Sequence, residues 1–393
     1  MRVALFHFGM YKKGGWERTF SLAKGLAANG CCVTVITTDD KKGIAYNINK
    51  VEGINVIRCK DVLPDIVLTK GFGLFSFIER LCFVIFHSFE IVHADSHRPN
   101  SYYPCILNRY LYKGKFIIEW WDNFSYDGQL ANKKRIFKLT LGRWEEKTEI
   151  VSKLRADGVV VLSQAMRERA LNCGVVKNKI QVIHGGSDIN NIRYLEKTID
   201  NDNLSKYDII FGFIGYGDSE INDLMPFFQA IRSITVNYSI RVMNFGKEFS
   251  QKSIETLGLE KIIVNCGWID YHSDTTLLSY PDIYVLLKKD NTINKCGWPN
   301  KLGDYMACGR PIMLNLYGDL YGFVSEYPYG FIVVEYIERD IIKAIKNIIN
   351  GNYNLTDMGK YNRTIAENLL SWNAKSQELL EFYRKIYNKE LNR

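Results

Sequence analysis

The sequence lacks the features that mark secreted, disulfide-stabilised and membrane-spanning proteins. Its nine cysteines are an odd number and include no Cys-x-x-Cys pair, so we expect no disulfide framework and a reducing, cytoplasmic location. No apolar run reaches the ~18 uncharged residues of a membrane helix, because Glu79 and Arg80 interrupt the longest candidate, residues 72–89. The first residues lead directly into a strand-like run, and we therefore expect no signal peptide.

The sequence also has too little excess of basic residues to indicate nucleic-acid binding. Lys and Arg total 51 against 43 Asp and Glu, a net charge of +8, and no arginine-rich arm, zinc-finger spacing or RNA-recognition signature is present. A mild positive charge favours smaller anionic partners such as phosphates, nucleotides or anionic lipid head groups. With 393 residues, 47% of them hydrophobic, the chain is predicted to be globular and to form two domains.

Short apolar runs alternate with helical patterns along the first half of the chain. Most runs are continuously apolar, which is typical of strands buried on both faces of a parallel sheet. The expected strands are residues 3–8, 32–37, 55–58, 91–94, 116–120, 159–162 and 181–184, and the helical patterns between them include 16–28, 74–87 and 133–153. This alternation predicts a doubly wound α/β layer.

A polar stretch at residues 185–207 interrupts the rhythm and predicts an interdomain hinge. A second series of strands follows, at residues 209–214, 241–245, 262–266, 283–287, 312–315 and 331–334, and a last helical pattern covers 372–391. We therefore predict an α/β protein with two Rossmann-like doubly wound domains. The first comprises residues 1–188 together with a C-terminal helix, 372–393, that packs back on it, and the second comprises residues 206–371.

A glycine turn separates the first expected strand from the first expected helix. Residues 14–18 read Gly-Gly-Trp-Glu-Arg. Gly14 and Gly15 would let the backbone come close to a ligand, and the free N–H groups at the start of the helix would attract an anion. The stretch is shorter than the full G-x-G-x-x-G pattern, so a tight turn without chemical use is the alternative.

The most informative stretch is residues 296–311, Cys-Gly-Trp-Pro-Asn-Lys-Leu-Gly-Asp-Tyr-Met-Ala-Cys-Gly-Arg-Pro. Pro299 suits the first turn of a helix, and Gly309 suits its C-terminal end. The free N–H groups of the helix start and the ammonium of Lys301 would meet at one place, which suits a diphosphate. Asp304 lies on nearly the same helix face. The alternative is a capped helix with a surface Lys–Asp pair.

Five stretches, in matching order, resemble the family 4 glycosyltransferases of the GT-B fold. The glycine turn resembles their G-G-x-E-R opening, and residues 89–93, Phe-Glu-Ile-Val-His, are similar to their D-[IV]-[IV]-H strand. Residues 160–168 are similar to V-x-x-S-x-x-x-[RK]-E, and residues 182–188, Val-Ile-His-Gly-Gly-Ser-Asp, resemble V-I-x-N-G-[VS]-D. Residues 298–307 are similar to P-[SN]-K-x-x-E-Y-M-A.

The resemblance implies two domains that face a cleft, with a nucleotide sugar on the second and the acceptor on the first. It implies a hexosyl- or other glycosyltransferase that moves a sugar, with retention of configuration, from a nucleotide-diphosphate sugar to a glycan or lipid-linked acceptor in cell-surface polysaccharide synthesis. No metal and no cofactor beyond the donor are expected, because helix dipoles and basic side chains would carry the diphosphate charge. Residues 72–89 and the basic residues 133–135 suggest a peripheral contact with the inner face of the cell membrane. The alternative is a helix packed against the sheet, which explains most of the apolar character of residues 72–89 equally well.

The resemblance and the positions after strands together assign the site residues. Residues just past the carboxyl end of a parallel strand face the functional crevice, so Asp122 is expected near the anomeric carbon, with Glu119 behind it and Trp121 against the acceptor. The alternative is that Trp120 is core and Asp122 only caps a loop. The expected catalytic residues are Asp122, Asp304 and Lys301, the acceptor-side residues are His93, Glu119 and Trp121, and the donor-binding residues are Gly14, Gly15, Gly267, Trp268, Ile269, Cys296, Pro299, Asn300 and Leu302.

The chain departs from the family pattern at two places. The acidic E-x7-E motif falls on Cys296 and Asp304, so the first acid is absent, and residues 215–222 contain no Arg…Lys pair. We expect Lys301 to take over part of the phosphate binding. A non-catalytic GT-B protein that binds a glycan or partner, and a nucleotide-sugar epimerase, remain as alternatives. The Asp-Asn-Asp at 200–202 looks like a metal motif of another glycosyltransferase fold, but it lies in the polar hinge, where we expect a solvated loop.

Overall fold

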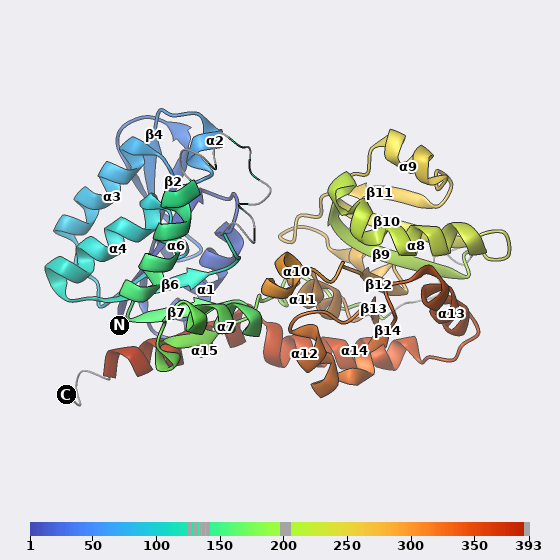
Figure 1. Cartoon of the computed structure of the whole chain (residues 1–393). Coiled ribbons are helices and arrows are strands. Elements are labelled where there is room, and N and C mark those ends of the chain that lie inside the picture. Colours follow the sequence, from blue (N-terminus) through green and yellow to red (C-terminus); the bar gives the residue numbers. More distant parts are fainter. Residues whose placement is uncertain are drawn as a thin grey trace. The chain divides into compact units, whose positions relative to one another are not determined.

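A computed structural model describes residues 1–124, 128, 130, 133, 135, 138, 142–196 and 206–388. The chain divides into two compact α/β units (Figure 1). The first unit comprises Met1–Gly185, Lys295–Trp298 and Trp372–Arg393, and the second comprises Gly186–Asn294 and Pro299–Ser371. Lys295–Trp298 had been assigned to the second domain from the sequence, but it belongs to the first unit.

The first unit contains a sheet that is parallel except at one edge. Its described strands are β1 (Arg2–Met10), β2 (Cys32–Lys42), β3 (Asn47–Val51), β4 (Ile54–Asp61), β5 (Ile91–Ala94), β6 (Lys115–Trp120), β7 (Gly158–Val161) and β8 (Ile180–Val182). Their order is β3-β4-β2-β1-β5-β6-β7-β8, and only β3 and β4 pair antiparallel. The predicted strands are present, whereas β3 was not predicted because it is a mostly polar, exposed edge strand.

Helices cover both faces of this sheet, as expected for a doubly wound layer. They are α1 (Trp16–Ala28), α2 (Asp65–Leu68), α3 (Leu74–Phe86), α4 (Pro99–Tyr112), α6 (Arg143–Arg155), α7 (Gln164–Asn172) and α15 (Trp372–Asn388). Successive residues of β1 point to opposite faces: Leu5 packs with α1 and α15, and Phe6 packs with α3, α4 and α7. Both sets of contacts are apolar, which explains why the strand sequences are continuously hydrophobic.

The C-terminal helix α15 packs on the first unit, as predicted. Leu379 and Tyr383 are fully buried in the apolar cluster that also contains Phe20 of α1. A Cβ on Gly25 would lie 2.1 Å from Ser376 Oγ, so glycine is needed where α1 and α15 approach each other. The last residues of the predicted helix, 389–391, lie outside the described residues.

The second unit has a fully parallel sheet in the order β11-β10-β9-β12-β13-β14. The strands are β9 (Ile209–Tyr216), β10 (Ile240–Lys247), β11 (Ile263–Gly267), β12 (Ile283–Leu286), β13 (Ile312–Leu314) and β14 (Phe331–Val333). The helices are α8 (Ile221–Ile234), α9 (Gln251–Leu257), α11 (Asn300–Ala307), α12 (Leu320–Glu326), α13 (Glu338–Ile349) and α14 (Leu355–Ile365), and α10 (Thr292–Cys296) begins in the second unit and ends in the first. A large core cluster, rich in phenylalanine, lies between the sheet and the helices α8 and α13.

Several sequence-based expectations fall partly outside the described residues. The helical pattern at 133–153 is described as a continuous helix only from Arg143, in α6, and Lys134 of the basic stretch 133–135 is not described. The Asp-Asn-Asp at 200–202 also lies outside the described residues. Among the helices that the structure describes, none has the length and apolar character needed to cross a membrane.

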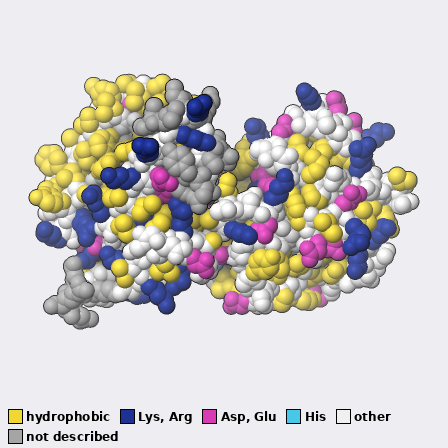
Figure 2. Space-filling view, viewed as in Figure 1, with side chains coloured by type: hydrophobic (Ala, Val, Ile, Leu, Met, Phe, Trp, Pro, Cys, Tyr) yellow, Lys and Arg dark blue, Asp and Glu magenta, His cyan; other side chains and the backbone are white. Residues whose placement is uncertain are grey.

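Apolar side chains are exposed along α3. Figure 2 shows hydrophobic side chains gathered over the part of the first unit that α3 occupies in Figure 1. The exposed side chains of this helix are Leu74, Phe75, Ile78, Ile85 and Phe86. Phe86 has 80% of its surface in solvent. Helix α3 therefore presents one apolar face to the protein interior and a second to the outside.

Candidate functional site

The glycine turn of the first unit is fixed by a contact with Trp121. Gly15 immediately precedes α1, and Gly14 has a φ of +62°, in the left-handed region that favours glycine. A Cβ built on Gly15 would lie 1.9 Å from the indole of Trp121. The two predicted site elements, the glycine turn and the end of β6, are therefore in contact, and this packing requires glycine at position 15.

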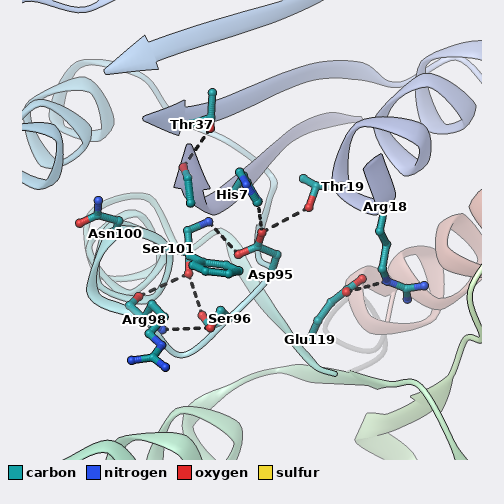
Figure 3. A network of polar contacts seen from close by, with 12 residues as sticks. His7, Arg18, Thr19, Thr37, Asp95, Ser96, Arg98, Asn100, Ser101 and Glu119 are labelled. Carbon is teal, nitrogen blue, oxygen red and sulfur yellow. Dashed lines mark hydrogen bonds and ion pairs between the residues drawn. The ribbon is translucent and has the colours of Figure 1, made fainter. Parts of the chain in front are cut away.

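A buried histidine–carboxylate pair holds the same turn against the sheet (Figure 3). His7 Nδ1 lies 2.6 Å from Asp95 Oδ2, and His7 Nε2 lies 3.0 Å from the carbonyl oxygen of Lys13, which is part of the turn. The other oxygen of Asp95 accepts a hydrogen bond from the backbone N–H of Phe8 at 3.0 Å. Sequence analysis missed this pair, because His7 lies inside an apolar strand and Asp95 belongs to no motif.

The predicted acceptor-side residues meet around the Glu119 carboxylate. Arg18 Nε donates to Glu119 Oε2 at 2.8 Å, as Figure 3 shows, and Trp121 Nε1 donates to the same oxygen. His93 Nε2 lies 3.6 Å from Glu119 Oε1, and its Nδ1 contacts the hydroxyl of Tyr383. The structure thus brings together His93, Glu119 and Trp121, and it adds the arginine of the glycine-turn motif.

Burial and ion pairing shift the pKa of these groups in opposite directions. Burial favours a higher pKa for Glu119, but Arg18 and His93 outweigh it and lower the pKa, so Glu119 is a carboxylate. Burial lowers the pKa of His93, so its imidazole is neutral at neutral pH. Glu119 therefore neutralises Arg18 and orients Trp121 rather than carrying a free charge.

A cavity of about 180 Å³ lies beside this group, within the first unit. It is bounded by residues of β1 and β6, by residues that follow α2, β5 and β6, and by one residue of α6: Phe8, Thr69, Lys70, Asp95, Ser96, His97, Arg98, Glu119, Trp120, Trp121, Asp122, Phe124 and Lys153. Asp122 is half-buried in its wall. Trp120 is fully buried in the apolar core, which agrees with the alternative that the sequence left open for this residue.

Buried charged side chains of α6 contact the residues after β5 that line the cavity. His97 Nε2 lies 2.9 Å from Glu145 Oε1, and Arg98 donates to Glu145 Oε2 at 2.6 Å. Burial lowers the pKa of His97 to about 4, so this histidine is neutral. Trp120 Nε1 donates to Glu149 at 2.6 Å. None of these pairings was predicted, because α6 lies far from β5 and β6 in the sequence.

In the second unit, the start of α11 lies beside two lysines and a glutamate. Helix α11 begins at Asn300 after Pro299, close to the prediction. Lys301 Nζ donates to Glu220 Oε1 at 2.7 Å, and Lys288 Nζ donates to Glu220 Oε2 at 2.6 Å. We call Lys288, Glu220 and Lys301 the lysine cluster. The Lys301–Asp304 pair considered from the sequence does not form.

The members of the lysine cluster come from three elements that end or begin at the same edge of the sheet. Glu220 ends the turn before α8, Lys288 follows β12, and Lys301 belongs to the first turn of α11. Lys288 Nζ also donates to Asp223 at 3.0 Å. Burial favours a higher pKa for Glu220, but the two lysines outweigh it and lower the pKa. Lys288 and Glu220 were not predicted from the sequence, although Lys288 lies just after β12 and Glu220 lies in the turn after β9.

Asp304 points to a different part of the second unit. Its carboxylate accepts hydrogen bonds from Ser187 Oγ at 2.7 Å and Tyr271 OH at 3.0 Å. Burial raises the pKa of Asp304 to about 6. Leu302, also predicted as donor-binding, is fully buried in the interior. Asp304 therefore joins α11 to the segment at Ser187 and the loop after β11, and its two oxygens already have partners.

Two exposed aromatic side chains lie beyond the strands of the second unit. Gly267 ends β11 with a φ of +73°, and Trp268, which is 70% exposed, follows it. Trp268 packs edge-on against Tyr216 at the end of β9, with ring centroids 6.2 Å apart. Ile269 is half-buried. Tyr216 was not predicted, because strand order alone brings β9 and β11 to either side of β10.

Cys296 lies in the first unit and packs within it. Its side chain is buried in the apolar cluster around β5 and β6, and its carbonyl oxygen accepts a hydrogen bond from Ser163 Oγ at 2.6 Å. Trp298 stacks on His184 with ring centroids 3.9 Å apart. The position of the family's first acid therefore contributes a packing contact within the first unit. In the described part of the chain, no group of His, Cys, Asp and Glu side chains is arranged to hold a metal ion.

Comparisons with known proteins give a family similarity over residues 13–191 and the fold of the whole chain. Residues 13–191 match the model of Glycosyltransferase Family 4. No curated protein sequence matches the chain significantly. Among solved structures, sucrose-phosphate synthase from Thermosynechococcus elongatus superimposes with a TM-score of 0.74 at 16% identity, covering 99% of each chain.

Two further structures are similar along their full length. HepE from Anabaena in complex with UDP-glucose superimposes with a TM-score of 0.66 at 13% identity, covering 100% of each chain. WaaG, described as a glycosyltransferase involved in lipopolysaccharide biosynthesis, superimposes with a TM-score of 0.65 at 11% identity, covering 99% of each chain. Residues 13–191 are thus similar to the glycosyltransferase family 4 model, and over its whole length the chain has the GT-B fold.

Proposed function

We propose that this protein is a retaining, metal-independent glycosyltransferase that moves a hexosyl or related sugar from a nucleotide-diphosphate sugar to a glycan or lipid-linked acceptor. The lysine cluster at the start of α11 carries the proposal. Two ammonium groups, Lys288 and Lys301, lie within 2.7 Å of one carboxylate beside the free N–H groups of a helix start. Such a place attracts the two phosphates of a nucleotide.

The surface near the end of β9 and β11 offers groups that suit the base of a nucleotide donor. Tyr216 and Trp268 offer exposed aromatic rings for a base, and aromatic stacking on a base is favourable for any base. The complexes of HepE with UDP and UDP-glucose support a nucleotide sugar as the donor of a protein with this fold. The proposed role of Lys301 is to stabilise the negative charge that develops on the leaving diphosphate.

The acceptor, in this proposal, enters the cavity of the first unit. Asp122 lies in the cavity wall just after β6, where a carboxylate would stabilise or deprotonate groups near the anomeric carbon. Trp121, held by Glu119 and by the close contact with Gly15, supplies a rigid ring against which a sugar would stack. His93 supports the same carboxylate from behind.

We place this activity in the cytoplasm, at the inner face of the cell membrane, in the synthesis of cell-surface polysaccharide. The apolar side chains exposed on α3, with Phe86 and Ile78 among them, suit a helix that lies on a lipid surface. Lys70 and Lys113, near the two ends of the α3–α4 region in the sequence, would add attraction to anionic lipids. WaaG, which has the same fold, is described as acting in lipopolysaccharide biosynthesis.

The test is a panel of UDP-, GDP- and ADP-sugars, measured by thermal shift and by slow hydrolysis of the donor. One donor should raise the melting temperature, because a ligand that binds only the folded state stabilises it, and the same donor should be hydrolysed without acceptor. Lys301→Ala should abolish both effects. Lys289→Ala, at an exposed lysine next to Lys288 in the chain, is the matched control. Unchanged donor affinity in Lys301→Ala would refute the assigned site.

A second candidate is a non-catalytic protein of the same fold that binds a nucleotide sugar or a glycan. The observation that favours it is Cys296, whose buried side chain supplies no carboxylate at the position of the family's first acid. This candidate predicts a thermal shift without hydrolysis for every donor in the panel. Hydrolysis of one donor that depends on Asp122 would exclude it.

A further inference from the structure

The cavity of the first unit has an unusual cation in its wall. Lys153 of α6 is only 1% exposed, and it lines the cavity together with residues that follow β5 and β6. Its ammonium lies 5.3 Å above the ring of Trp120, and its hydrogen-bond partner among the described residues is the hydroxyl of Ser152, at 3.2 Å. A buried ammonium that forms no close ion pair is costly, because burial removes its hydration.

Three other charged side chains that line the cavity, Asp95, Arg98 and Glu119, have close partners. Asp95 pairs with His7 at 2.6 Å, and Arg18 pairs with Glu119 at 2.8 Å. Arg98 pairs with Glu145 at 2.6 Å. These pairs leave the ammonium of Lys153 as the charge of the buried wall that has no ion-pair partner among the described residues.

Glu149, an acid on the same helix, is engaged through one of its two oxygens. Glu149 Oε1 accepts hydrogen bonds from Trp120 Nε1 at 2.6 Å and from the backbone N–H of Phe124 at 3.1 Å. Its other oxygen lies 3.9 Å from Arg169. Burial raises the pKa of Glu149 and lowers the pKa of Lys153 to about 7. An incoming anion would therefore favour the protonated form of Lys153 and pair with it.

We propose that Lys153 binds an anionic group of the acceptor, a carboxylate or a phosphate carried on its first sugar, and so makes the enzyme selective for acidic acceptors. This inference rests on the proposed function, since it names the acceptor class for the same cavity. The volume of about 180 Å³ equals the share of about six water molecules. That space suits one anionic group and part of a sugar ring, and it excludes a longer oligosaccharide from the buried part.

The first experiment compares binding of glucuronate, glucose 6-phosphate and neutral glucose to the full chain by thermal shift and titration calorimetry. Wild type should bind at least one of the two anionic sugars at least about tenfold more tightly than glucose, as expected for one charge-assisted hydrogen bond. The preferred probe distinguishes a uronate-type from a phosphate-type acceptor. Equal binding of all three sugars would overturn the proposal.

The matched variants are Lys153→Met and Lys147→Met. Lys147 lies on the same helix but is exposed, so its replacement should leave binding of the anionic sugars unchanged. Lys153→Met keeps the length of the side chain and should abolish the preference for the anionic sugars over glucose. Circular dichroism and binding of glucose check that the variant is folded. An anionic preference that survives in folded Lys153→Met would overturn the assignment of Lys153.

A pH series with glucuronate separates binding by Lys153 from a merely structural effect. The carboxylate of this probe does not titrate between pH 6 and 8, and the charges facing Lys153 are Glu145 and Glu149 on α6, Arg98 and His97 after β5, Asp122 after β6 and Arg169 on α7. His97 stays neutral in this range. Affinity for glucuronate should fall about tenfold from pH 6 to pH 8 as the free Lys153 loses its proton, and Lys153→Met should show no such fall.

The donor panel keeps this inference distinguishable from the proposed function. Donor binding together with equal affinity for charged and neutral acceptor sugars would remove the acidic-acceptor inference alone. Binding of anionic sugars that depends on Lys153, without binding of any nucleotide sugar, would remove the proposed transferase and leave the anion site in place.

Discussion

Glu220 is the acidic centre of the lysine cluster, and its replacement by glutamine should tighten the binding of a nucleoside diphosphate. Lys288 and Lys301 contribute two positive charges, and Glu220 and Asp223 cancel them through distances of 2.6–3.0 Å. Glu220→Gln keeps the size of the side chain and removes one negative charge. The site that faces the donor phosphates then gains one net positive charge.

The size of the effect follows from the distance. A phosphate at the start of α11 would lie roughly 6 Å from the Glu220 carboxylate if it contacts Lys301. Two unit charges at ~6 Å interact by about 3 kcal/mol at an effective dielectric constant of ~20. Salt and the paired lysines screen part of this repulsion, so we expect a gain of about 1.4 kcal/mol, which is tenfold in Kd.

The same substitution should lower the stability of the fold. Both lysines lose a charged acceptor that lies mostly buried between them, and removing one partner of such a group costs about 2 kcal/mol when the pair is partly solvated. The affinity and the stability are therefore expected to change in opposite directions. A purely structural role of Glu220 would lower both together.

The assay is titration calorimetry with UDP, GDP and ADP at low and high salt, paired with urea unfolding. Lys301→Met and Lys288→Met should weaken binding about tenfold each, since each removes a charge-assisted hydrogen bond. Glu260→Gln, at an exposed acid of the same unit, is the control for a general change in charge. Weaker binding in Glu220→Gln, to the extent seen in Lys301→Met, would refute the placement of the diphosphate at this cluster.

Three further outcomes are expected. Gly15→Ala should displace the Trp121 indole, which lies 1.9 Å from the added Cβ, and lower the unfolding free energy by about 1–3 kcal/mol, with a changed tryptophan emission; unchanged emission and stability would contradict this packing. Burial raises the pKa of Asp304 to about 6, so the folded state holds this proton more tightly than the unfolded one, and a stabilising contribution present below pH 5 is lost as the pH rises through 6. Wild type should therefore lose about 1 kcal/mol of unfolding free energy relative to Asp304→Asn between pH 5 and pH 7, and parallel pH–stability curves would rule this out. Ile78→Ser with Phe86→Ser should reduce co-flotation with phosphatidylglycerol vesicles without loss of stability, because both side chains are exposed; undiminished flotation would exclude α3 as the lipid contact.

Much of the fold follows from periodicity, because both sheets are buried on both faces. Continuous apolar runs of four to eight residues are strands in such layers, and each predicted strand is present with both ends within five residues of those expected. The exception is β3, Asn47–Val51, which pairs only at an exposed edge. Its stability comes from hydrogen bonds to β4 rather than from burial, so it leaves no hydrophobic pattern in the sequence.

Site residues were predictable from the sequence only where a polar or aromatic residue lies at the end of a strand within a recognisable motif. Glu119 and Trp121 lie at the end of β6, and the structure brings them together with the arginine of the glycine turn. His7 and Asp95 are 88 residues apart in the chain and meet because β1 and β5 are neighbours. Lys288 depends in the same way on the order of β9 and β12. The order of strands in a sheet depends on the tertiary fold. A motif of a few residues therefore cannot predict contacts that depend on that order.

In helix α11, Lys301 and Asp304 contact different parts of the second unit, although their spacing in the sequence predicts neighbouring side chains. Lys301 and Asp304 are three residues apart, which predicts neighbouring side chains, yet Lys301 reaches Glu220 across the ring of Phe213, whereas Asp304 turns to Ser187. The long lysine side chain extends beyond the first turn, and the short aspartate is held by two hydroxyl donors. Substitutions at Lys301 should therefore change donor affinity with little effect on stability, and substitutions at Asp304 should change stability and its pH dependence first. A loss of donor affinity in Asp304→Asn as large as that in Lys301→Ala, at equal stability, would show that the two ends of the helix act on the same ligand.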